Sequence, residues 1–353
     1  MREFFAKKGV IPSWKTYFVT AMGAMAQGLF ASLLVGTILN TLGAKLGIPF
    51  LVDIAGYVGA NSPVVGAAIG VAVAAALKAD GLVLLSSSVV GAIGYMLGAQ
   101  INVGGEVISY AAGPAGSFFA VLVSCELGKL VSKETRVDIL VTPLVVILSG
   151  YGVARLLCPV IAYGMYYAGA FVNSATEMQP FLMGILVSVT VGILLTLPVS
   201  SAAICAMIGI SGLAGGAATV GCCCQMVGFA VMSFRENRWG GLVAQGLGTS
   251  MLQMGNICKR PVIWLPTILS SAILGPVSTL VFGLTNNGVS AGMGTCGLVG
   301  PLGVITAAGS MDATRWVGLI LLCFLLPAAL TLLFSELMRK LGWIRAGDLK
   351  LEL

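Results

Sequence analysis

Uncharged polar side chains within apolar segments are the residues of this sequence best suited to binding chemistry. They carry amide and hydroxyl groups, which bind a partner through reversible hydrogen bonds. Such groups cost less at membrane depth than a charge, for which insertion costs roughly 2.5–3.5 kcal/mol at the bilayer centre. They suit a solute that has many hydroxyls and no charge, such as a sugar. The candidate substrate-binding residues are Asn286, Asn287, Ser290, Thr295, Gln253 and Gln225.

Four of these six residues lie in one glycine-rich stretch, Leu284–Met311, which holds seven glycines and no charge. The stretch is apolar enough for a membrane but too rich in glycine for a regular spanning helix. Irregular backbone survives at that depth only where protein or a water-filled cavity satisfies its polar groups. Transporters use such broken segments around their substrates. We expect a broken or re-entrant segment here; the alternative is a loosely packed loop outside the membrane.

For each polar residue taken alone, the competing interpretation is an ordinary hydrogen bond between helices. The concentration of amides and hydroxyls between Gln225 and Thr295 favours a site for the group as a whole. Four charged residues lie near the ends of apolar runs: Asp53, Glu106, Glu126 and Arg155. These positions fall near predicted helix ends, so we interpret them as interface residues.

No catalytic constellation is present in the sequence. The chain has no histidine, the usual general base. It also lacks a Walker A loop, an HExxH pair and a GxSxG elbow. Its nine cysteines form no CxxC or Cys/His pattern, and the Cys222–Cys224 triplet cannot face one side of a helix. We therefore expect no catalytic residue, no metal and no cofactor.

Composition places the chain in a membrane. Hydrophobic residues make up 58% of its 353 residues and charged residues only 9%, whereas soluble domains are about 25% charged. The net charge of +6 comes from lysines and arginines clustered at helix ends, as the positive-inside rule produces, and does not indicate nucleic-acid binding. We expect a multi-pass protein of the inner or plasma membrane, in contact with lipid, with a cytoplasmic N-terminus.

The elements that must position the candidate site are about ten transmembrane helices in an all-α membrane protein. A span needs roughly 20 apolar residues. The predicted spans are Tyr17–Leu39, Pro49–Leu77, Leu82–Ala99, Ala115–Val131, Ile139–Tyr163, Phe181–Leu197, Val199–Leu213, Ala217–Phe234, Leu242–Ile257 and Val262–Leu284, followed after the glycine-rich stretch by Trp316–Leu337. Two polar joints, Gln100–Gly113 and Tyr166–Gln179, are predicted outside the membrane.

Short matches in the same order suggest an internal duplication. Gly28–Gly36 resembles Gly184–Gly192, and Ser62–Ile69 resembles Leu197–Ile204. With five spans each, the second repeat enters the membrane inverted, an arrangement common in secondary transporters. The sequence therefore predicts a single membrane domain, 1–353. It consists of repeat 1 at 15–165, repeat 2 at 180–284, a re-entrant segment at 285–311 and a last helix at 315–341. Lys259 and Arg260 fall on the wrong side in this scheme.

Three motifs carry a resemblance to a known family. They are Ser233–Gly241, Gln245–Gln253 and Asn286–Thr295. Across roughly residues 15–340 the chain resembles the membrane-embedded EIIC proteins of the bacterial phosphotransferase system, in the branch of the perfringolysin O regulator. The resemblance implies a sugar-transport fold of about ten spans, a homodimer, and a separate IIB-type partner that phosphorylates the sugar. The histidine used near the sugar in that family has no counterpart here.

Two functions follow from these observations. The first is a permease for a small polar solute, with carbohydrate as the favoured class, working by alternating access. The second is a membrane-embedded sensor that binds a ligand without moving it and regulates gene expression through a cytoplasmic partner. Accumulation of solute in vesicles distinguishes the two, because a sensor binds without accumulating.

Overall fold

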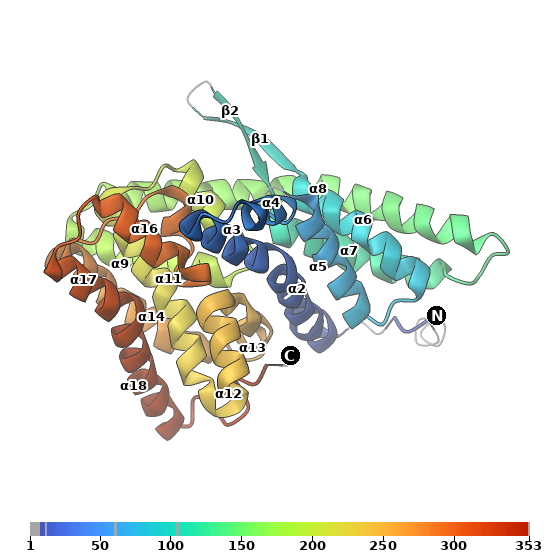
Figure 1. The fold of residues 1–353 in the computed structure, drawn as a ribbon. Helices are drawn as coiled ribbons and strands as arrows, with labels where there is room; N and C mark the ends of the chain where they lie inside the picture. Colours follow the sequence, from blue (N-terminus) through green and yellow to red (C-terminus); the bar gives the residue numbers. More distant parts are fainter. Residues whose placement is uncertain (1–7, 11–12, 60–61, 104–105, 352–353) are drawn as a thin grey trace. The chain divides into compact units, whose positions relative to one another are not determined.

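The computed structural model describes residues 8–10, 13–59, 62–103 and 106–351. The chain divides into two compact units, unit 1 ending at Tyr166 and unit 2 beginning at Tyr167 (Figure 1). Within the described residues, six helical segments are long and apolar enough to cross a membrane. They are Lys15–Ala44, Gly113–Val131, Asp138–Thr176, Gly212–Met232, Pro261–Phe282 and Ala313–Lys340. Four shorter apolar helices accompany them: Pro63–Ala76, Gly81–Met96, Pro180–Thr196 and Cys296–Ala308. The predicted helical membrane class is confirmed at this level, and the repeats stay a prediction.

The first spanning segment of unit 1 is a continuous helical run. It consists of η1 (Lys15–Ala21), α2 (Met22–Leu29), η2 (Phe30–Leu34) and α3 (Val35–Leu46). Gly28 lets this run approach α5 closely, since a Cβ added there would lie 2.8 Å from the Ala68 carbonyl oxygen. Small residues permit such contact where lipid gives helices no hydrophobic drive to associate.

The predicted span Pro49–Leu77 is wrong, because two helices occupy it. These are α4 (Pro49–Tyr57) and α5 (Pro63–Ala76). Ser62 starts the second helix: its hydroxyl accepts a 3.2 Å hydrogen bond from the Val64 N–H, and Pro63 follows at the first helical position. Serine at the cap and proline at the first position are a strong helix-start signal.

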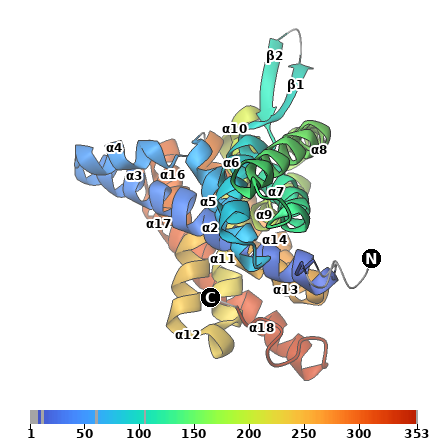
Figure 2. The same cartoon turned by 90° about the vertical axis from the view of Figure 1, so that its right-hand side faces the viewer.

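The predicted joint Gln100–Gly113 is largely a β-hairpin, which qualifies the all-α expectation. Strand β1 (Gly98–Val103) pairs antiparallel with β2 (Glu106–Ala111), with Gly98 opposite Ala111. The hairpin projects away from α6 (Gly81–Met96) and α7 (Gly113–Val131), the helices that flank it in sequence (Figure 2). The Gly-Gly pair at 104–105 in the sequence, between two short alternating stretches, is the hairpin signal that span counting overlooks.

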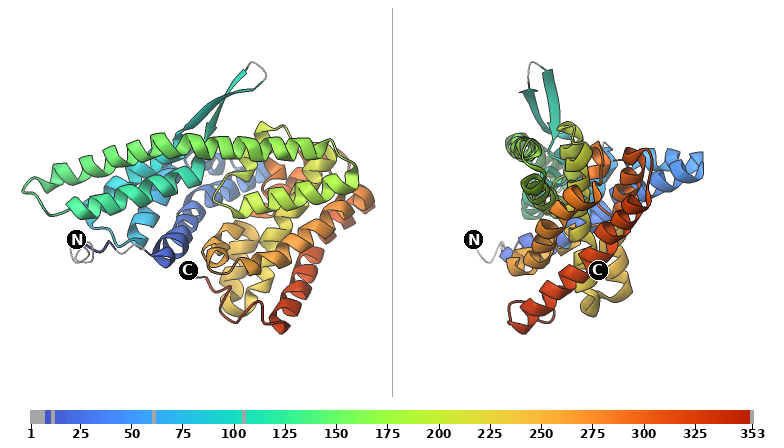
Figure 3. Two further views of the ribbon diagram at one scale, coloured as in Figure 1. Left: turned by 180° about the vertical axis from the view of Figure 1, so that it is seen from behind. Right: turned by 90° about the vertical axis from the view of Figure 1, so that its left-hand side faces the viewer.

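The predicted joint Tyr166–Gln179 is also wrong over most of its length. Helix α8 (Asp138–Thr176) continues through it as one long helix, drawn in green in Figure 3. Between Tyr166 and Thr176 there is no proline, and polar residues alone do not end a helix. The helix ends just before Gln179–Pro180, where α9 (Pro180–Thr196) begins.

The basic loop between α7 and α8 is held by ion pairs within unit 1. Lys8 pairs with Glu134 and donates a 2.6 Å hydrogen bond to the Ser132 carbonyl. The Lys133 ammonium lies 2.8 Å from an Asp80 carboxylate oxygen, and this hydrogen bond raises the pKa of Lys133 above its usual value. The loop therefore presents an ordered charged surface.

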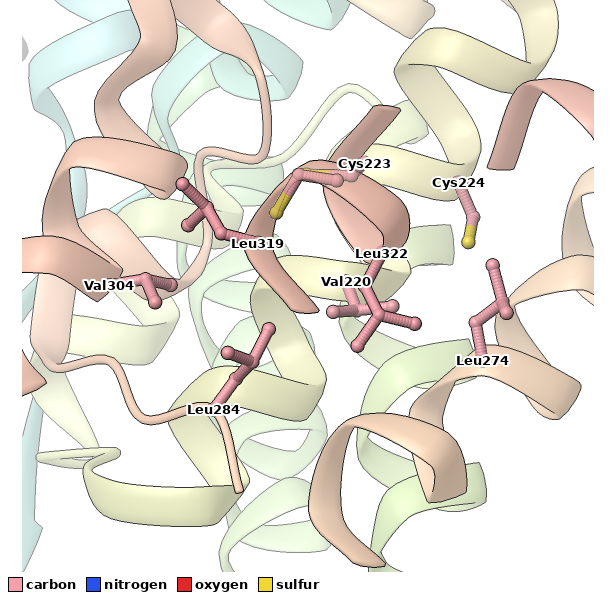
Figure 4. Close-up of a cluster of buried hydrophobic side chains, with 9 residues drawn as sticks. Val220, Cys223, Cys224, Leu274, Leu284, Val304, Leu319 and Leu322 are labelled. Atoms are coloured by element: carbon pink, nitrogen blue, oxygen red, sulfur yellow. The ribbon is translucent and has the colours of Figure 1, made fainter. Parts of the chain in front are cut away.

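Unit 2 is built around α11 (Gly212–Met232), which is buried along nearly its whole length. It packs against α9, α14 (Leu265–Val277) and α18 (Leu326–Lys340). A cluster of apolar side chains packs α11 against α14 and against residues 284–323 (Figure 4). Its buried members are Val220, Cys223, Cys224, Leu274, Leu284, Val304, Leu319, Leu322 and Cys323. These cysteines therefore act as small core side chains.

Two predicted spans of unit 2 are wrong because glycines and a capping hydroxyl interrupt them. Within Val199–Leu213 the structure has only the short α10 (Ser201–Met207). Within Leu242–Ile257 it has the end of α12 (Phe234–Val243), the π turn η3 (Ala244–Gly248), the 3₁₀ turn η4 (Ser250–Gln253) and the start of α13 (Met254–Lys259). Thr249 begins the second turn, since its hydroxyl accepts from the Met251 N–H at 3.1 Å.

The last part of the chain returns to regular helix. η5 (Pro261–Trp264) leads into α14, which ends in the π turn η6 (Ser278–Phe282). The glycine-rich stretch follows as three short pieces, α15 (Gly288–Ala291), η7 (Cys296–Leu298) and α16 (Val299–Ala308). Then α17 (Ala313–Ile320), η8 (Leu321–Leu325) and α18 form the final long helical run.

Candidate functional site

The glycine-rich stretch lies lengthwise along α11, and this packing positions the candidate site. At one end, Cβ atoms added to Gly215 or Gly216 would lie 2.0 and 1.9 Å from the carbonyl oxygens of Asn286 and Leu284. Further along, the hydroxyl of Thr219 lies 3.5 Å from the Ala291 carbonyl oxygen. Only glycine allows the two backbones to come this close, so the sequence of α11 determines where the stretch docks.

The irregular backbone of this stretch is satisfied by protein. The Asn286 N–H donates to the Gly212 carbonyl at 3.2 Å, and the Gly288 N–H donates to the Ile210 carbonyl at 2.8 Å. The stretch is packed into unit 2, with Asn286, Ala291 and Thr295 buried. The stretch is therefore interrupted and closely packed, and its entry into the membrane stays a prediction.

Asn286 is the residue that holds this segment together. Its amide nitrogen donates to the Thr219 hydroxyl at 2.8 Å and to the Gly300 carbonyl at 3.1 Å. Its amide oxygen accepts from the Asn287 N–H at 2.8 Å and from the Ser290 hydroxyl at 2.7 Å. Both amide hydrogens and both oxygen lone pairs are thus in use, so Asn286 orients its neighbours.

Asn287 and Ser290 stand beside Asn286 with hydrogen-bonding capacity to spare. The Asn287 side chain is exposed and makes no hydrogen bond to another residue that the structure describes. The Ser290 hydroxyl has one proton and two acceptors within reach, the Asn286 amide oxygen and the Asn287 carbonyl, both at 2.7 Å. These two residues can offer donors and acceptors to a solute.

Thr295 joins the two broken segments of unit 2. Its hydroxyl donates to the carbonyl of Gly246, in the π turn η3, at 2.5 Å. It also lies 3.6 Å from the Met226 sulfur on α11. Thr295 is fully buried, so it connects the turn after α12 to the glycine-rich stretch.

Gln225 lies on α11, six residues beyond Thr219, or about 9 Å along the helix. Its amide oxygen accepts from the Trp264 indole N–H and the Thr267 hydroxyl, both at 2.9 Å, and lies 3.4 Å from the Thr196 hydroxyl. Thr196 in turn lies 2.8 Å from the Ser250 hydroxyl. The side chain is fully buried, but its amide nitrogen has no hydrogen-bond partner among the described residues.

Gln253 belongs to a different cluster, which holds the C-terminal segment. Its amide nitrogen donates to the side chain of Gln245 at 2.9 Å and to the Leu349 carbonyl at 3.0 Å. Its oxygen accepts from Asn256 at 2.8 Å, and Asn256 also donates to the Lys350 carbonyl at 2.9 Å. The amide hydrogens of Gln253 are therefore already committed.

The same C-terminal segment has two further anchors. Asn237 donates to the Leu349 carbonyl and accepts from the Leu351 N–H, both at 2.8 Å. Arg260 pairs with Asp348 at 3.3 Å. Arg260, predicted on the wrong side of the membrane by counting spans, thus has a structural partner at the end of the chain.

The structure brings four of the six candidates together in one packed region and leaves Gln253 in the separate cluster that holds the C-terminal segment. Asn286, Asn287, Ser290 and Thr295 share the glycine-rich stretch, and Gln225 lies further along the helix against which the stretch packs. Sequence reasoning missed the hydroxyl and indole partners of these residues. They are Thr196, Thr219, Ser250, Trp264 and Thr267. Single hydroxyls in apolar runs carry no pattern of their own.

The most deeply buried polar side chains that the structure describes in unit 2 are uncharged. Its nearly buried charges, Glu236 and Arg339, form an ion pair with each other at 3.0 Å. The buried amides described in the chain, Gln225, Gln245, Gln253, Asn256 and Asn286, all lie in this unit. No group of three or more His, Cys, Asp or Glu side chains that could hold a metal occurs within the described residues. The buried amides and hydroxyls can bind a neutral molecule by hydrogen bonds.

A multi-pass helical membrane protein with broken helices and buried uncharged amides has the architecture of a solute carrier. Comparison with protein families matches residues 19–351 to "Phosphotransferase system, EIIC". The chain belongs to this family, and the predicted resemblance is confirmed. Membership makes it a permease-type membrane protein and implies, at the level of the family, a carbohydrate substrate and a cooperating IIB component. No curated protein and no solved structure matches the chain.

Proposed function

We propose that this protein carries a small, uncharged, polyhydroxylated solute, a carbohydrate, across the membrane by alternating access. One observation carries the proposal: the most deeply buried polar side chains of unit 2 are all neutral, and its buried amides lie in or beside broken helices. A neutral polyol exchanges its hydrogen bonds with water for hydrogen bonds with amides and hydroxyls. A charged solute would lose hydration without gaining an unpaired counter-ion, because the nearly buried charges of Glu236 and Arg339 are paired with each other.

The proposed site lies on the glycine-rich stretch. Asn287 and Ser290 are the proposed direct ligands because they retain hydrogen-bonding capacity. Asn286 and Thr295 position them: Asn286 bonds to both, and Thr295 ties the stretch to η3. Gln253 remains a proposed ligand only for a state in which the C-terminal segment releases its amide.

The transport cycle we propose uses two inverted repeats, a homodimer and a cytoplasmic N-terminus. The basic loop between α7 and α8 supports the orientation, because lysines and arginines of short loops favour the cytoplasmic side. In this orientation, the ordered charges of Lys8 and Lys133 lie on the side where a IIB-type partner would dock.

The first test is a thermal-shift screen of the purified chain in detergent against neutral sugars, sugar phosphates and small polar metabolites. A ligand at a hundred times its Kd stabilises the folded state by about 2.7 kcal/mol. We expect a neutral sugar to raise the melting temperature and Asn287→Ala to abolish that shift without lowering the ligand-free melting temperature. Asn173→Ala is the matched control, because Asn173 is another exposed asparagine of unit 2; it should change neither the ligand-free melting temperature nor the shift.

Uptake into vesicles then separates the permease from the ligand sensor. A permease accumulates labelled solute inside reconstituted vesicles, whereas a sensor binds it at the surface and does not accumulate it. Binding without uptake, measured with a IIB partner both present and absent, would replace the transport proposal with the regulator. Binding that survives Asn287→Ala would remove Asn287 from the site.

A further inference from the structure

We propose that the Gln225 side chain is a specificity-determining ligand: its free amide N–H groups donate to a hydroxyl or carbonyl oxygen of the solute. The inference rests on the proposed transport function and names a second recognition point for the same solute. It assigns the selection of neutral oxygen acceptors to one hydrogen-bonded cluster, made up of Gln225, Thr196, Ser250, Trp264 and Thr267.

The orientation of the Gln225 amide follows from its neighbours. An indole N–H only donates, so the atom 2.9 Å from the Trp264 nitrogen must be the amide oxygen. The Thr267 hydroxyl lies 2.9 Å from the same oxygen. Turning the amide over would set two donors against each other at Trp264. The amide nitrogen, and not the oxygen, is therefore the group that faces away from these partners.

That nitrogen is a buried donor without an acceptor. Gln225 is fully buried, and its amide nitrogen has no hydrogen-bond partner among the described residues. Most buried polar groups in proteins are paired, and an exception calls for a specific explanation. The other buried amides of unit 2 for which hydrogen bonds are described, including Asn286 and Gln253, have their amide hydrogens paired.

The hydroxyls around Gln225 leave its amide nitrogen without an acceptor. The single proton of Thr267 has two acceptors at 2.9 Å, the Gln225 oxygen and the Trp264 carbonyl. Thr196 and Ser250 lie 2.8 Å apart, and either can donate to the other. Among the described residues, no hydroxyl oxygen accepts from the Gln225 amide nitrogen. The missing partner is therefore an acceptor for this nitrogen, which a guest oxygen would supply.

The cluster lies beside places where helices are interrupted, and we propose that the solute enters there. Ser250 lies in η4, one residue after the glycine-containing π turn η3, and Trp264 ends the 3₁₀ turn η5. Trp264 is only partly buried, whereas Gln225, Thr196, Ser250 and Thr267 are buried. The partly exposed indole ring offers an apolar surface for the C–H face of a sugar.

These properties define the solute chemically. It must present an oxygen acceptor to the amide, and it must be neutral because the side chains around Gln225 are uncharged. An ammonium group cannot occupy this position because it only donates. A hydroxyl or carbonyl of a neutral sugar meets these conditions. The corresponding amino sugar and sugar acid each violate one of them.

The decisive variant is Gln225→Glu, studied by calorimetric binding with the full chain in detergent. Glutamate keeps an oxygen facing Trp264 and Thr267 but replaces the two amide N–H donors with a carboxyl oxygen that carries at most one proton. The probes are D-glucose, D-galactose, D-mannose, D-fructose and D-mannitol, with D-glucosamine and D-gluconate as the charged comparisons. We expect the best neutral probe to bind Gln225→Glu at least tenfold more weakly than wild type, and both charged probes to bind wild type poorly.

Ser271→Ala is the matched control, because the Ser271 hydroxyl reaches the Thr267 carbonyl at 2.9 Å and the Gly221 carbonyl at 3.4 Å but has no described hydrogen bond to the Gln225 amide. It should leave affinity unchanged. Equal affinity of wild type and Gln225→Glu for the best probe overturns the inference and leaves the proposed function standing. Failure of every neutral probe to bind wild type overturns the proposed function as well.

A second measurement does not depend on the folding of Gln225→Glu. Monodeoxy analogues of the best probe are bound to the wild-type protein and to Ser250→Ala. We expect one analogue to lose at least tenfold in affinity on wild type, and the loss to shrink on Ser250→Ala because that variant weakens the same contact. If all monodeoxy analogues bind wild type as well as the parent sugar, no solute oxygen is recognised and the inference is wrong.

Discussion

Release of the C-terminal segment by Asn237→Ala is the prediction that most directly tests the packing of unit 2. Asn237 makes two hydrogen bonds with this segment, one to the Leu349 carbonyl and one from the Leu351 N–H, both at 2.8 Å. Alanine removes both at once. The Leu349 carbonyl keeps its second donor, Gln253, at 3.0 Å, so the segment is weakened and not freed completely.

The size of the effect can be worked out from these contacts. A hydrogen bond of this kind contributes about 0.5–1.5 kcal/mol net, so two contribute about 1–3 kcal/mol. The population of the open segment should therefore rise roughly five- to 150-fold. Asp348→Asn should destabilise the docked segment less, by about 0–1 kcal/mol, because the ion pair of Asp348 with Arg260 is partly exposed. Leu349→Ala should destabilise it most, by about 2–5 kcal/mol, because Leu349 is fully buried.

Hydrogen exchange measured by mass spectrometry on the purified chain in detergent reports the opening directly. Exchange of a peptide covering residues 343–351 accelerates in proportion to the open population when closing is fast. The expected order of rates is wild type, Asp348→Asn, Asn237→Ala, then Leu349→Ala. Asn173→Ala, which removes an exposed amide not bonded to the segment, is the control and should match wild type.

Two results would refute this reasoning. If the segment exchanges at the rate of an unstructured peptide in the wild-type protein, it is not docked in solution. If Asn237→Ala matches the control while Leu349→Ala opens the segment, apolar burial alone holds it, and the amide contacts contribute nothing measurable.

Three further predictions concern unit 2. Gly216→Ala should lower stability in thermal unfolding by about 1–3 kcal/mol or more, because its Cβ would meet the Leu284 carbonyl oxygen at 1.9 Å. The control Gly240→Ala, where a Cβ has open space, should be neutral or stabilising by up to about 1 kcal/mol. Equal effects of the two substitutions would contradict the close packing at Gly216. All nine cysteines are described by the structure, and only Cys258 is partly exposed; burial raises the pKa of its thiol. Maleimide labelling of the native protein should therefore stop at one site, and its rate should be lower than for a free cysteine at pH 7 and should rise about tenfold per pH unit below that pKa. A second labelled site would show that the core opens. Trp264→Phe removes one donor to the Gln225 oxygen and should cost about 1 kcal/mol of stability while weakening solute binding; unchanged binding would separate the indole from the site.

Regular spans were the part of the fold most readily predicted. The ends of the predicted spans Ala115–Val131 and Phe181–Leu197 lie within two residues of the ends of α7 and α9. Each is an uninterrupted apolar run bounded by glycine, proline or charge, and in lipid a helix is the structure in which such a run pairs its own backbone groups. Runs containing Pro63 or Gly246 were predicted as single spans and are interrupted in the structure. Hydropathy counts apolar residues, whereas local capping and glycine determine where a helix begins and ends.

The candidate site shows the same division. Asn286 was predicted as a substrate ligand from its residue type, and the structure uses all of its hydrogen-bonding groups to organise the broken segment. Gln253 was also predicted as a substrate ligand from its residue type, and the structure shows it, together with Asn256, holding the end of the chain. Residue type identifies which side chains can form hydrogen bonds but not which partner occupies them.

The sequence by itself determined that this is a multi-pass helical membrane protein of the EIIC family, with neutral polar residues in its second half. Composition and motifs are properties of the sequence itself, so they identify the class and the family without knowledge of tertiary contacts. Tertiary structure alone decided that Gln225 meets Trp264, and that its amide nitrogen is left free. That outcome requires four segments, separated by up to 71 positions from Thr196 to Thr267, to meet around one side chain. It also depends on the indole N–H, which can only donate.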